Sequence, residues 1–175
     1  MNGEISLKYK VKNINKSFGN LKVLDNISIS FPENKTTCIL GPSGCGKTTL
    51  LNIIAGLLDA DSGELIGFKN ENFSFVFQED RLIPWKSVED NLAFVLKKNT
   101  DKREVDKLIN HYLELVSLEK YKHYYPKDLS GGMKQRINIL RAFIYDSKIL
   151  IMDEPFKSLD IDNKQIVMDF FEELM

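Results

Sequence analysis

The sequence has few cysteines, no long apolar run and almost no net charge. Its two cysteines, Cys38 and Cys45, form neither a metal-binding pattern nor a plausible disulfide, so we interpret them as a core thiol and a loop thiol. The longest apolar stretches are too short to span a bilayer, and residues 1–4 lack the pattern of a signal peptide. A net charge of −1 gives no electrostatic reason to expect nucleic acid as a partner. These absences predict a cytoplasmic protein that binds no nucleic acid.

The length and the periodicity of the chain predict one α/β domain. A chain of 175 residues can bury one core but is too short for two ordinary domains. The mixture of short β-prone runs and segments with helical spacing predicts an α/β fold. Strands are expected over residues 5–11, 23–31, 36–40, 65–66, 73–77 and 149–154. Helices are expected over 48–58, within 87–127, from an opening at 129–136 through Ile144, and over 162–175.

A glycine-rich loop of the phosphate-binding type lies between the strand expected at 36–40 and the helix expected at 48–58. Its glycines tolerate positive φ and have no Cβ, so a turn can bring several backbone N–H groups onto one anion. Lys47 supplies positive charge to the outer phosphates, and Thr48 offers a hydroxyl to Mg²⁺. The alternative is a glycine-rich turn without a ligand. The loop consists of Gly41, Pro42, Ser43, Gly44, Cys45, Gly46, Lys47, Thr48 and Thr49.

A second helix start and a pair of carboxylates carry further phosphate chemistry. Residues 130–132, a serine and two glycines, present bare N–H groups and a hydroxyl to an anion, although such a sequence is also a common N-cap. The apolar run 149–152 ends in Asp153 and Glu154. Asp153 is placed to hold Mg²⁺ through its waters, and Glu154 to orient or deprotonate an attacking water. The pair could instead cap a surface turn.

Several polar and aromatic residues leave two interpretations open. Phe18, at a turn, could stack on an adenine ring or pack at an edge, and Gln78, after a strand, could reach Mg²⁺ or face solvent. Trp85 could belong to an interface or cap a core. His111 and His123 have no Cys, Asp or His partner at ligand spacing, so we interpret them as structural.

The ordered motifs resemble the nucleotide-binding subunit of an ABC transporter, over essentially the whole chain. Two stretches, 78–85 and 153–156, are similar to the importer ATPases of the nitrate, sulfonate and taurine group. The resemblance implies a P-loop NTPase (RecA-like) core with an N-terminal antiparallel β subdomain and a helical insertion. The single domain would place the ATP-binding core at 1–85 and 129–175 and the helical subdomain at 86–128. The motifs are residues 41–49, Gln78, 129–136, 149–154 and 158–160.

The resemblance also implies roles for the candidate residues. Glu154 would be the catalytic carboxylate, assisted by Lys47 and Gln78. Mg²⁺ and its waters would be served by Thr48, Gln78 and Asp153. ATP would contact Phe18 through its adenine and residues 41–49 through its phosphates. From a second subunit, the γ-phosphate would meet Ser130, Gly131 and Gly132, so that two copies enclose two ATP molecules head to tail. Asp160 would also belong to the nucleotide-binding residues.

The partners implied by the resemblance are a second nucleotide-binding subunit and membrane-spanning permease subunits, with a solute-binding protein acting indirectly. The chain would lie on the inner face of the cell membrane, and residues 78–85 and the helices that follow them would meet the permease. Two alternatives stay open. One is a soluble, non-transport ABC ATPase. The other is a nucleotide-binding module that does not hydrolyse ATP.

The sequence departs from the family pattern in its C-terminal part. The family has a histidine after the strand that follows Glu154, and this sequence ends at Met175 before reaching it. Neither His111 nor His123 stands in by position. In the family that strand lies between the phosphate-loop strand and the Asp153 strand. We therefore expect C-terminal strands to be missing, the domain to be incomplete, and ATP binding to survive better than hydrolysis.

Overall fold

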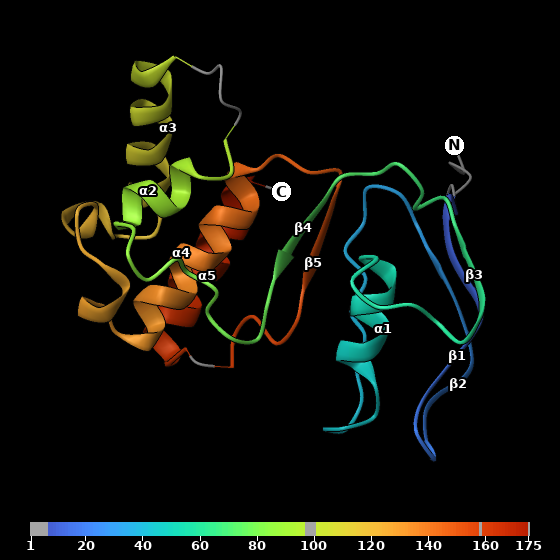
Figure 1. Ribbon diagram of the computed structural model, residues 1–175. Coiled ribbons are helices and arrows are strands. Elements are labelled where there is room, and N and C mark those ends of the chain that lie inside the picture. Colours follow the sequence, from blue (N-terminus) through green and yellow to red (C-terminus); the bar gives the residue numbers. More distant parts are fainter. Residues whose placement is uncertain (1–6, 97–100, 158, 175) are drawn as a thin grey trace. The chain divides into compact units, whose positions relative to one another are not determined.

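The computed structural model describes residues 7–96, 101–157 and 159–174, which form two compact units, Met1–Asn72 and Phe73–Met175 (Figure 1). Both units combine strands with helices, so the expected mixture of α and β structure is confirmed. In the described residues no helix is long and apolar enough to cross a membrane. The start of the strand expected at 5–11, Ser158 and Met175 lie outside the described residues.

The first unit contains a three-stranded antiparallel sheet in the order β2-β1-β3. Strands β1 (Tyr9–Phe18) and β2 (Leu21–Phe31) form a hairpin, and β3 (Ser62–Ile66) pairs with the other edge of β1. Two residues join the hairpin, and Gly19 has a φ of 58°, which suits the tight turn. The predicted antiparallel β structure near the N-terminus is confirmed, although β1 extends seven residues beyond Val11.

Helix α1 (Lys47–Ile54) follows the phosphate loop and is shorter than the predicted helix over 48–58. The chain leaves the helix at Gly56, whose φ is 70°. The Gly56 N–H donates to the Ile53 carbonyl at 3.0 Å, and the Leu57 N–H donates to the Asn52 carbonyl at 2.8 Å. This pair of bonds is a Schellman motif, which satisfies the last carbonyls and ends the helix early.

The strand predicted over residues 36–40 is wrong. These five residues have no regular secondary structure, and Leu40 is 86% exposed. A β-prone segment becomes a strand only when a neighbouring strand completes its backbone hydrogen bonds. Within the described residues, the sheets contain only β1 to β5, and none of these strands pairs with 36–40. The interpretation of Cys38 as a core thiol is wrong for the same reason, because Cys38 is exposed; both cysteines are free.

The second unit is built on a two-stranded parallel sheet, β4 (Phe73–Val76) and β5 (Ile149–Met152), paired in register from Phe73 with Ile149 to Val76 with Met152. The predicted helical stretch after residue 87 is confirmed. It comprises α2 (Val88–Ala93), α3 (Lys102–Leu115) and two 3₁₀ turns (Glu119–Tyr121 and Pro126–Asp128). Helices α4 (Gly131–Ile144) and α5 (Ile161–Leu174) complete the unit.

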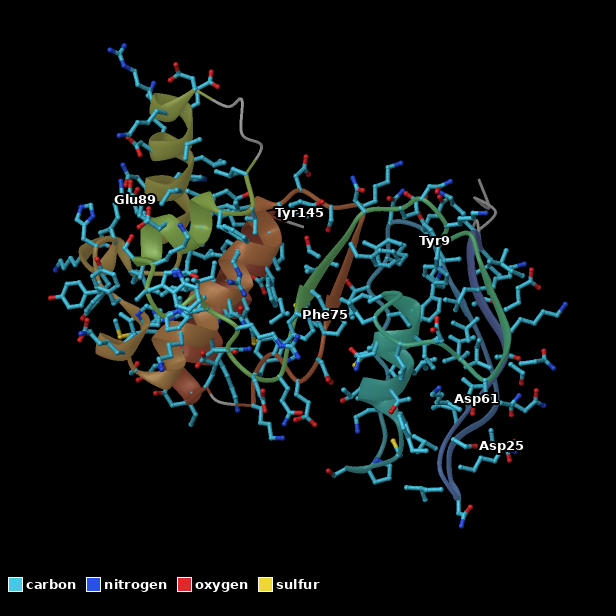
Figure 2. The ribbon with its side chains drawn as sticks, in the orientation of Figure 1. Tyr9, Asp25, Asp61, Phe75, Glu89 and Tyr145 are labelled. Atoms are coloured by element: carbon cyan, nitrogen blue, oxygen red, sulfur yellow. The ribbon has the colours of Figure 1, made fainter. Side chains whose placement is uncertain are left out.

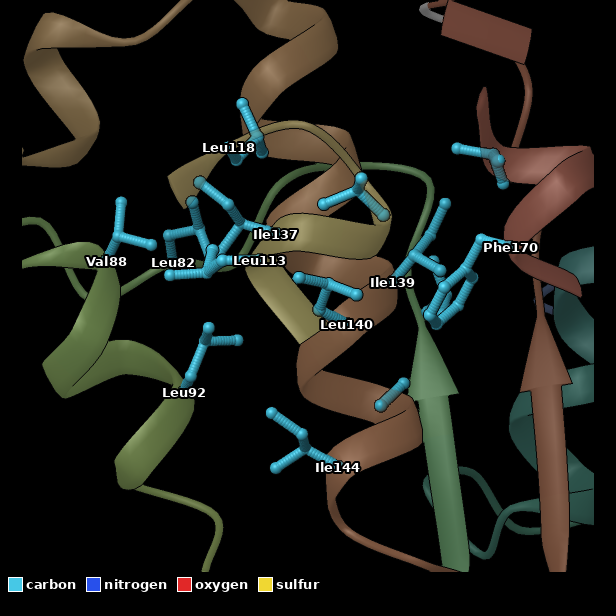
Figure 3. Packing of buried hydrophobic residues seen from close by; sticks show 14 of the residues in the cluster. Leu82, Val88, Leu92, Leu113, Leu118, Ile137, Ile139, Leu140, Ile144 and Phe170 are labelled. Atoms are coloured by element: carbon cyan, nitrogen blue, oxygen red, sulfur yellow. The ribbon is translucent and has the colours of Figure 1, made fainter. Parts of the chain in front are cut away.

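Helix α4 is the centre of the hydrophobic core of this unit. Figure 3 shows Ile137, Ile139 and Leu140 of α4 packed among apolar side chains from α2, α3 and α5, and all three are fully buried. Eight residues of α4 are buried, compared with two of α3. A helix that is buried nearly all round moves little relative to its neighbours, so α4 provides a rigid support for the residues at its N-terminus.

Candidate functional site

The phosphate loop adopts the backbone conformation that its glycines allow. Gly44 and Gly46 have φ values of 79° and 95°, both in the left-handed region that disfavours residues with a Cβ. Gly46 is also packed closely, since a Cβ built on it would lie 2.8 Å from the Leu24 side chain and 3.1 Å from the Val23 carbonyl of β2. Gly46 is therefore required both by its φ and by the approach of α1 to β2.

The start of α1 offers its backbone N–H groups to an anion. Gly46 is the N-cap, and among the described residues no side chain caps the helix and no acidic residue lies in its first turn. The first N–H groups of a helix have no partner within the helix, and the helix dipole favours negative charge at this end. The arrangement fits a phosphate group, as the loop pattern predicts.

Lys47 is folded onto the loop that contains it. Its Nζ donates to the carbonyl oxygens of Gly41 and Pro42, each at 2.9 Å, and lies 3.9 Å from the Sγ of Cys45. Gly41 allows this closed arrangement, because a Cβ on Gly41 would come within 2.7 Å of the Cys45 Sγ. The positively charged ammonium of Lys47 therefore lies inside the turn of the loop, where it could bind phosphate oxygens.

The Phe18 ring, at the end of β1, is 50% exposed, and the Nζ of Lys16 lies 5.6 Å from its centroid. An exposed ring is available for stacking, whereas edge packing would have buried more of it. Asp61, labelled in Figure 2, holds the strand just before Phe18. Its carboxylate accepts hydrogen bonds from the Lys16 Nζ at 2.9 Å and the Ser17 N–H at 2.7 Å.

The sequence patterns do not single out Asp61 as a functional residue. The hydrogen bond from Lys16, and after it the one from the Ser17 N–H, lower the pKa of the Asp61 carboxyl below its ordinary value. Both bonds favour the charged form. No local sequence signal could have found this contact, because the two partners are more than forty residues away along the chain.

The carboxylates of the second unit lie at the end of its parallel sheet. Because β4 and β5 are parallel, Gln78 and Asp153, which follow them, leave the sheet at the same edge. Asp153 is only 4% exposed, and its backbone N–H donates to the Val76 carbonyl at 2.9 Å. Gln78 is exposed, as either interpretation of it allows. The sheet therefore brings the two residues to one edge.

Glu154 lies in a tight turn directly after Asp153. Its φ is 49°, which is unusual for a residue with a side chain. The Oε2 of Glu154 is 2.6 Å from the Nζ of Lys157, and the Lys157 N–H donates to the Glu154 carbonyl at 3.1 Å. A strained backbone that is held by surrounding bonds is common at functional sites. Here the strain is observed at the residue proposed as the catalytic carboxylate.

The helix start at residues 130–132 has the predicted N-cap. The Ser130 Oγ accepts a hydrogen bond from the Met133 N–H at 3.3 Å, and Gly131 begins α4. Gly132 packs against α5, because a Cβ on it would lie 3.2 Å from the Nδ2 of Asn163. The cap interpretation is therefore confirmed, and it does not compete with anion binding, since both use the same helix end.

Asp160 plays a similar capping role before α5. Its carboxylate accepts hydrogen bonds from the Asn163 N–H at 2.9 Å and from the Asn163 side-chain amide at 2.8 Å. These bonds, first of all the one from the backbone, lower the pKa of Asp160 below its ordinary value. Asn163 therefore connects Asp160 to the α4 start through its packing against Gly132.

The segment 78–85 is held against α4. Arg141 of α4 donates to the Arg81 carbonyl at 2.8 Å, and the Arg81 guanidinium lies 3.7 Å from the centroid of the Phe77 ring. The fully buried Asn91 donates to the Ile83 carbonyl at 3.2 Å and accepts from its N–H at 2.7 Å. Two residues after Ile83, Trp85 is 77% exposed. The core-capping interpretation of Trp85 is therefore wrong.

The histidines differ in their surroundings. His123 is exposed, and its Nδ1 is 3.3 Å from the Oε2 of Glu89, whereas the His111 ring packs edge-on against Tyr112. The other candidate residues are divided between the two units. The first unit contains Phe18 and residues 41–49. The second contains Gln78, residues 130–132, the pair at 153–154, and Asp160.

The residues expected to serve Mg²⁺ carry donors of the type that this ion prefers. Thr48 of the first unit offers a hydroxyl, and Gln78 and Asp153 of the second unit offer an amide carbonyl and a carboxylate. All three are oxygen donors, and in nucleotide sites Mg²⁺ commonly takes one or two carboxylates together with substrate phosphates.

The comparisons with known proteins agree with these features. A protein-family model described as ABC transporter matches residues 24–157. The sulfate/thiosulfate import ATP-binding protein CysA of Acinetobacter baylyi is 42% identical over 168 residues, which are 88% of this chain and 48% of the relative. The aliphatic sulfonates import ATP-binding protein SsuB of Bacillus cereus is 42% identical over 163 residues, which are 89% of this chain and 64% of the relative.

A solved structure extends the likeness to the fold. The ATP-binding cassette MJ0796, solved as a dimer bound to ADP and Pi, has a TM-score of 0.83 and 29% identity, covering 95% of this chain and 82% of that chain. The likeness confirms the predicted P-loop NTPase fold. This chain spans about half the length of the sulfate/thiosulfate relatives it matches. The family match covers more than half of the chain, and the chain therefore belongs to the ABC transporter family.

Proposed function

We propose that this chain is the ATP-binding and hydrolysing subunit of an importer for a small oxyanion of the sulfate or sulfonate type. The observation that supports this most is the 42% identity to import ATP-binding proteins for sulfate or thiosulfate and for aliphatic sulfonates. Sulfonate is shared by the aliphatic sulfonates relative and the importer group that the motifs 78–85 and 153–156 resemble. The proposal also includes nitrate and taurine as transported solutes, because they belong to the same importer group.

Nucleotide binding is assigned to the first unit. The adenine would stack on the exposed Phe18 ring, and the phosphates would meet the loop 41–49 at the start of α1. Lys47 would exchange its bonds with the loop carbonyls for the outer phosphates. The closed loop supports this role, because the ammonium already lies inside the turn.

Hydrolysis is assigned to the end of the β4–β5 sheet, with Glu154 orienting or deprotonating the attacking water. Thr48, Gln78 and Asp153 would hold Mg²⁺, and the bound ion would neutralise charge on the phosphates. The bond from the Asp153 N–H to the Val76 carbonyl fixes the backbone of this buried residue at the end of the sheet, which supports the role. The reaction would be in-line attack of water on the γ-phosphorus.

A second copy of the chain would complete each site. Ser130, Gly131, Gly132 and Asp160 of one subunit would serve the ATP held by its partner, in the head-to-tail arrangement. The dimeric MJ0796 structure with ADP and Pi supports this proposal. The permease would meet the segment 78–85 through the exposed Trp85, and the subunit would then lie on the cytoplasmic face of the membrane. A solute-binding protein would supply the solute to the permease from the other side.

The domain organisation is proposed to follow the family. Residues 1–85 and 129–175 would form the ATP-binding core, and residues 86–128 the helical subdomain. The helices and 3₁₀ turns between Val88 and Asp128 support the second assignment.

The test of the function is ATP turnover and transport in the same preparation. The chain is purified with the permease from its own gene neighbourhood, reconstituted in liposomes, and supplied with radiolabelled sulfate, an aliphatic sulfonate, taurine or nitrate. We expect Mg²⁺-dependent ATP hydrolysis and uptake of a sulfur oxyanion. ATP binding without turnover would instead identify a nucleotide-binding module, and co-purification with ribosomes or DNA a non-transport ATPase.

A further inference from the structure

We infer that Gln135 is a positioning residue, which ties the turn containing Glu154 to the helix that begins at Ser130. The inference rests on the proposed function, since it concerns how one subunit links its share of two nucleotide sites. Residues 130–132 would serve the partner's ATP, and Glu154 the ATP of its own subunit. Gln135 joins the two.

The contact is direct and buried. The Nε2 of Gln135 donates to the carbonyl oxygen of Pro155 at 3.0 Å, and Gln135 is only 4% exposed. Pro155 directly follows Glu154, so the accepting carbonyl belongs to the same turn. A buried amide without a partner is costly, and this bond supplies the partner. The bond therefore constrains both the glutamine and the turn.

The turn is held at both ends. On its N-terminal side, the Asp153 N–H donates to the Val76 carbonyl of β4 at 2.9 Å. On its C-terminal side, Gln135 holds Pro155. Between these two bonds lies Glu154, with its φ of 49°. A left-handed conformation at a residue with a side chain persists only where its surroundings hold it, and Gln135 supplies one of these restraints.

Helix α4 connects this restraint to residues 130–132, which would serve the partner's ATP. Gln135 lies five residues after Ser130, which is about one and a half helical turns. The core packing of Ile137, Ile139 and Leu140 keeps this part of α4 rigid. Because this part of α4 is rigid, Gln135 fixes the Glu154 turn relative to the helix start that would meet the partner's nucleotide.

A purely space-filling role would not need an amide. The buried positions of α4 carry both apolar side chains, such as Ile137 and Ile139, and the polar side chains of Arg136 and Asn138, so burial alone does not require an amide at position 135. Methionine has nearly the volume of glutamine and no amide, and glutamate has the same shape but, when ionised, offers no donor to a carbonyl. The two substitutions remove the donor and keep the volume.

The experiment compares Gln135→Met and Gln135→Glu with Gln165→Met in the full chain. Gln165 lies on α5, is exposed, and donates to Asp169 at 2.7 Å, so it is a matched glutamine with only a local bond. We expect kcat to fall at least about tenfold in both Gln135 variants, with KM for ATP changed less than about threefold. The Hill coefficient for ATP should fall toward one. Gln165→Met should change none of these.

Hydrogen exchange over residues 154–159 provides a readout that does not depend on turnover. The Lys157 and Leu159 N–H groups donate to the Glu154 and Phe156 carbonyls at 3.1 and 3.3 Å, and they should exchange faster in both Gln135 variants. Unchanged exchange overturns the inference. So does an unchanged kcat, or a loss of kcat no larger than the loss of folded protein measured by thermal melting.

The two proposals fail in different ways. If the unsubstituted chain hydrolyses no ATP with its partners present, the proposed function fails, and the exchange data alone decide the role of Gln135. If the unsubstituted chain hydrolyses ATP and the Gln135 variants equal it, the inference fails and the proposed function stands.

Discussion

The side-chain ammonium of Lys47 lies 2.9 Å from the carbonyl oxygen of Gly41, the first residue of the phosphate loop. The ammonium also bonds the Pro42 carbonyl at 2.9 Å, so the lysine closes the loop on itself. A nucleotide would offer phosphate oxygens to the same group. The loop is therefore shaped around the charge that its ligand would use.

Replacing Lys47 by alanine should weaken ATP binding by about 10- to 100-fold, because a hydrogen bond to a charged group contributes about 1.5–3 kcal/mol. Isothermal titration with ATP measures the change. Lys22→Ala is the control, since Lys22 is a half-exposed lysine of the same unit paired with Asp25. Equal affinity of the Lys47 variant and the unsubstituted chain would contradict the assignment of the loop.

Replacing Glu154 by glutamine should leave ATP binding intact and lower ATP turnover by about 10²- to 10⁴-fold, the usual contribution of a general base. The substitution also removes the charge that pairs with Lys157. Lys157→Met is therefore the control, because it breaks the same ion pair and keeps the carboxylate. Phosphate release and ATP binding are measured for both variants. Equal losses of turnover would assign the effect to the ion pair.

Replacing Gly46 by alanine should destabilise the first unit by about 2–4 kcal/mol, the sum of left-handed strain and a steric clash. The added Cβ would lie 2.8 Å from Leu24, at a φ of 95°. Gly19→Ala is the matched control, since Gly19 has a φ of 58° and nothing within 4 Å of an added Cβ. Urea unfolding should show a smaller loss for Gly19→Ala, of about 1–2 kcal/mol. Equal losses would show that the close approach of α1 to β2 contributes nothing.

The bonds of Asp61 to Lys16 and Ser17 should make the first unit sensitive to acid. These bonds hold the pKa of Asp61 below its ordinary value of 3.8, so they stabilise the fold above that value. The stabilisation is lost as the pH falls through the lowered pKa. The melting temperature of Asp61→Asn should therefore lie below that of the unsubstituted chain at pH 7, and the difference should shrink as the pH falls below 3.8.

The control for this experiment is Asp25→Asn, which removes an exposed carboxylate from the same hairpin (Figure 2). A pH dependence shared by the two variants would contradict the specific role of Asp61. ATP affinity provides a second readout, because Asp61 holds the strand just before Phe18. Weakening of the bond between Asp61 and the Ser17 N–H should weaken adenine stacking and lower the ATP affinity of Asp61→Asn. The ATP affinity of Asp25→Asn should stay unchanged.

The local features of this protein follow from its sequence. Glycines at positions 44 and 46 predicted the left-handed backbone of the phosphate loop, and helical periodicity predicted α4 and its serine cap. The order of the motifs was enough to recognise the family. These features depend on side-chain chemistry and on neighbours within a few residues along the chain, so the sequence alone determines them.

The tertiary structure decided what depends on distant partners. Residues 36–40 have the composition of a strand, yet no strand in the described residues pairs with them. They therefore do not form a strand. The contacts of Asp61 with Ser17 and of Gln135 with Pro155 join residues 44 and 20 positions apart. Sequence spacing alone does not predict such pairs, because chain folding, and not local propensity, brings them within hydrogen-bond distance.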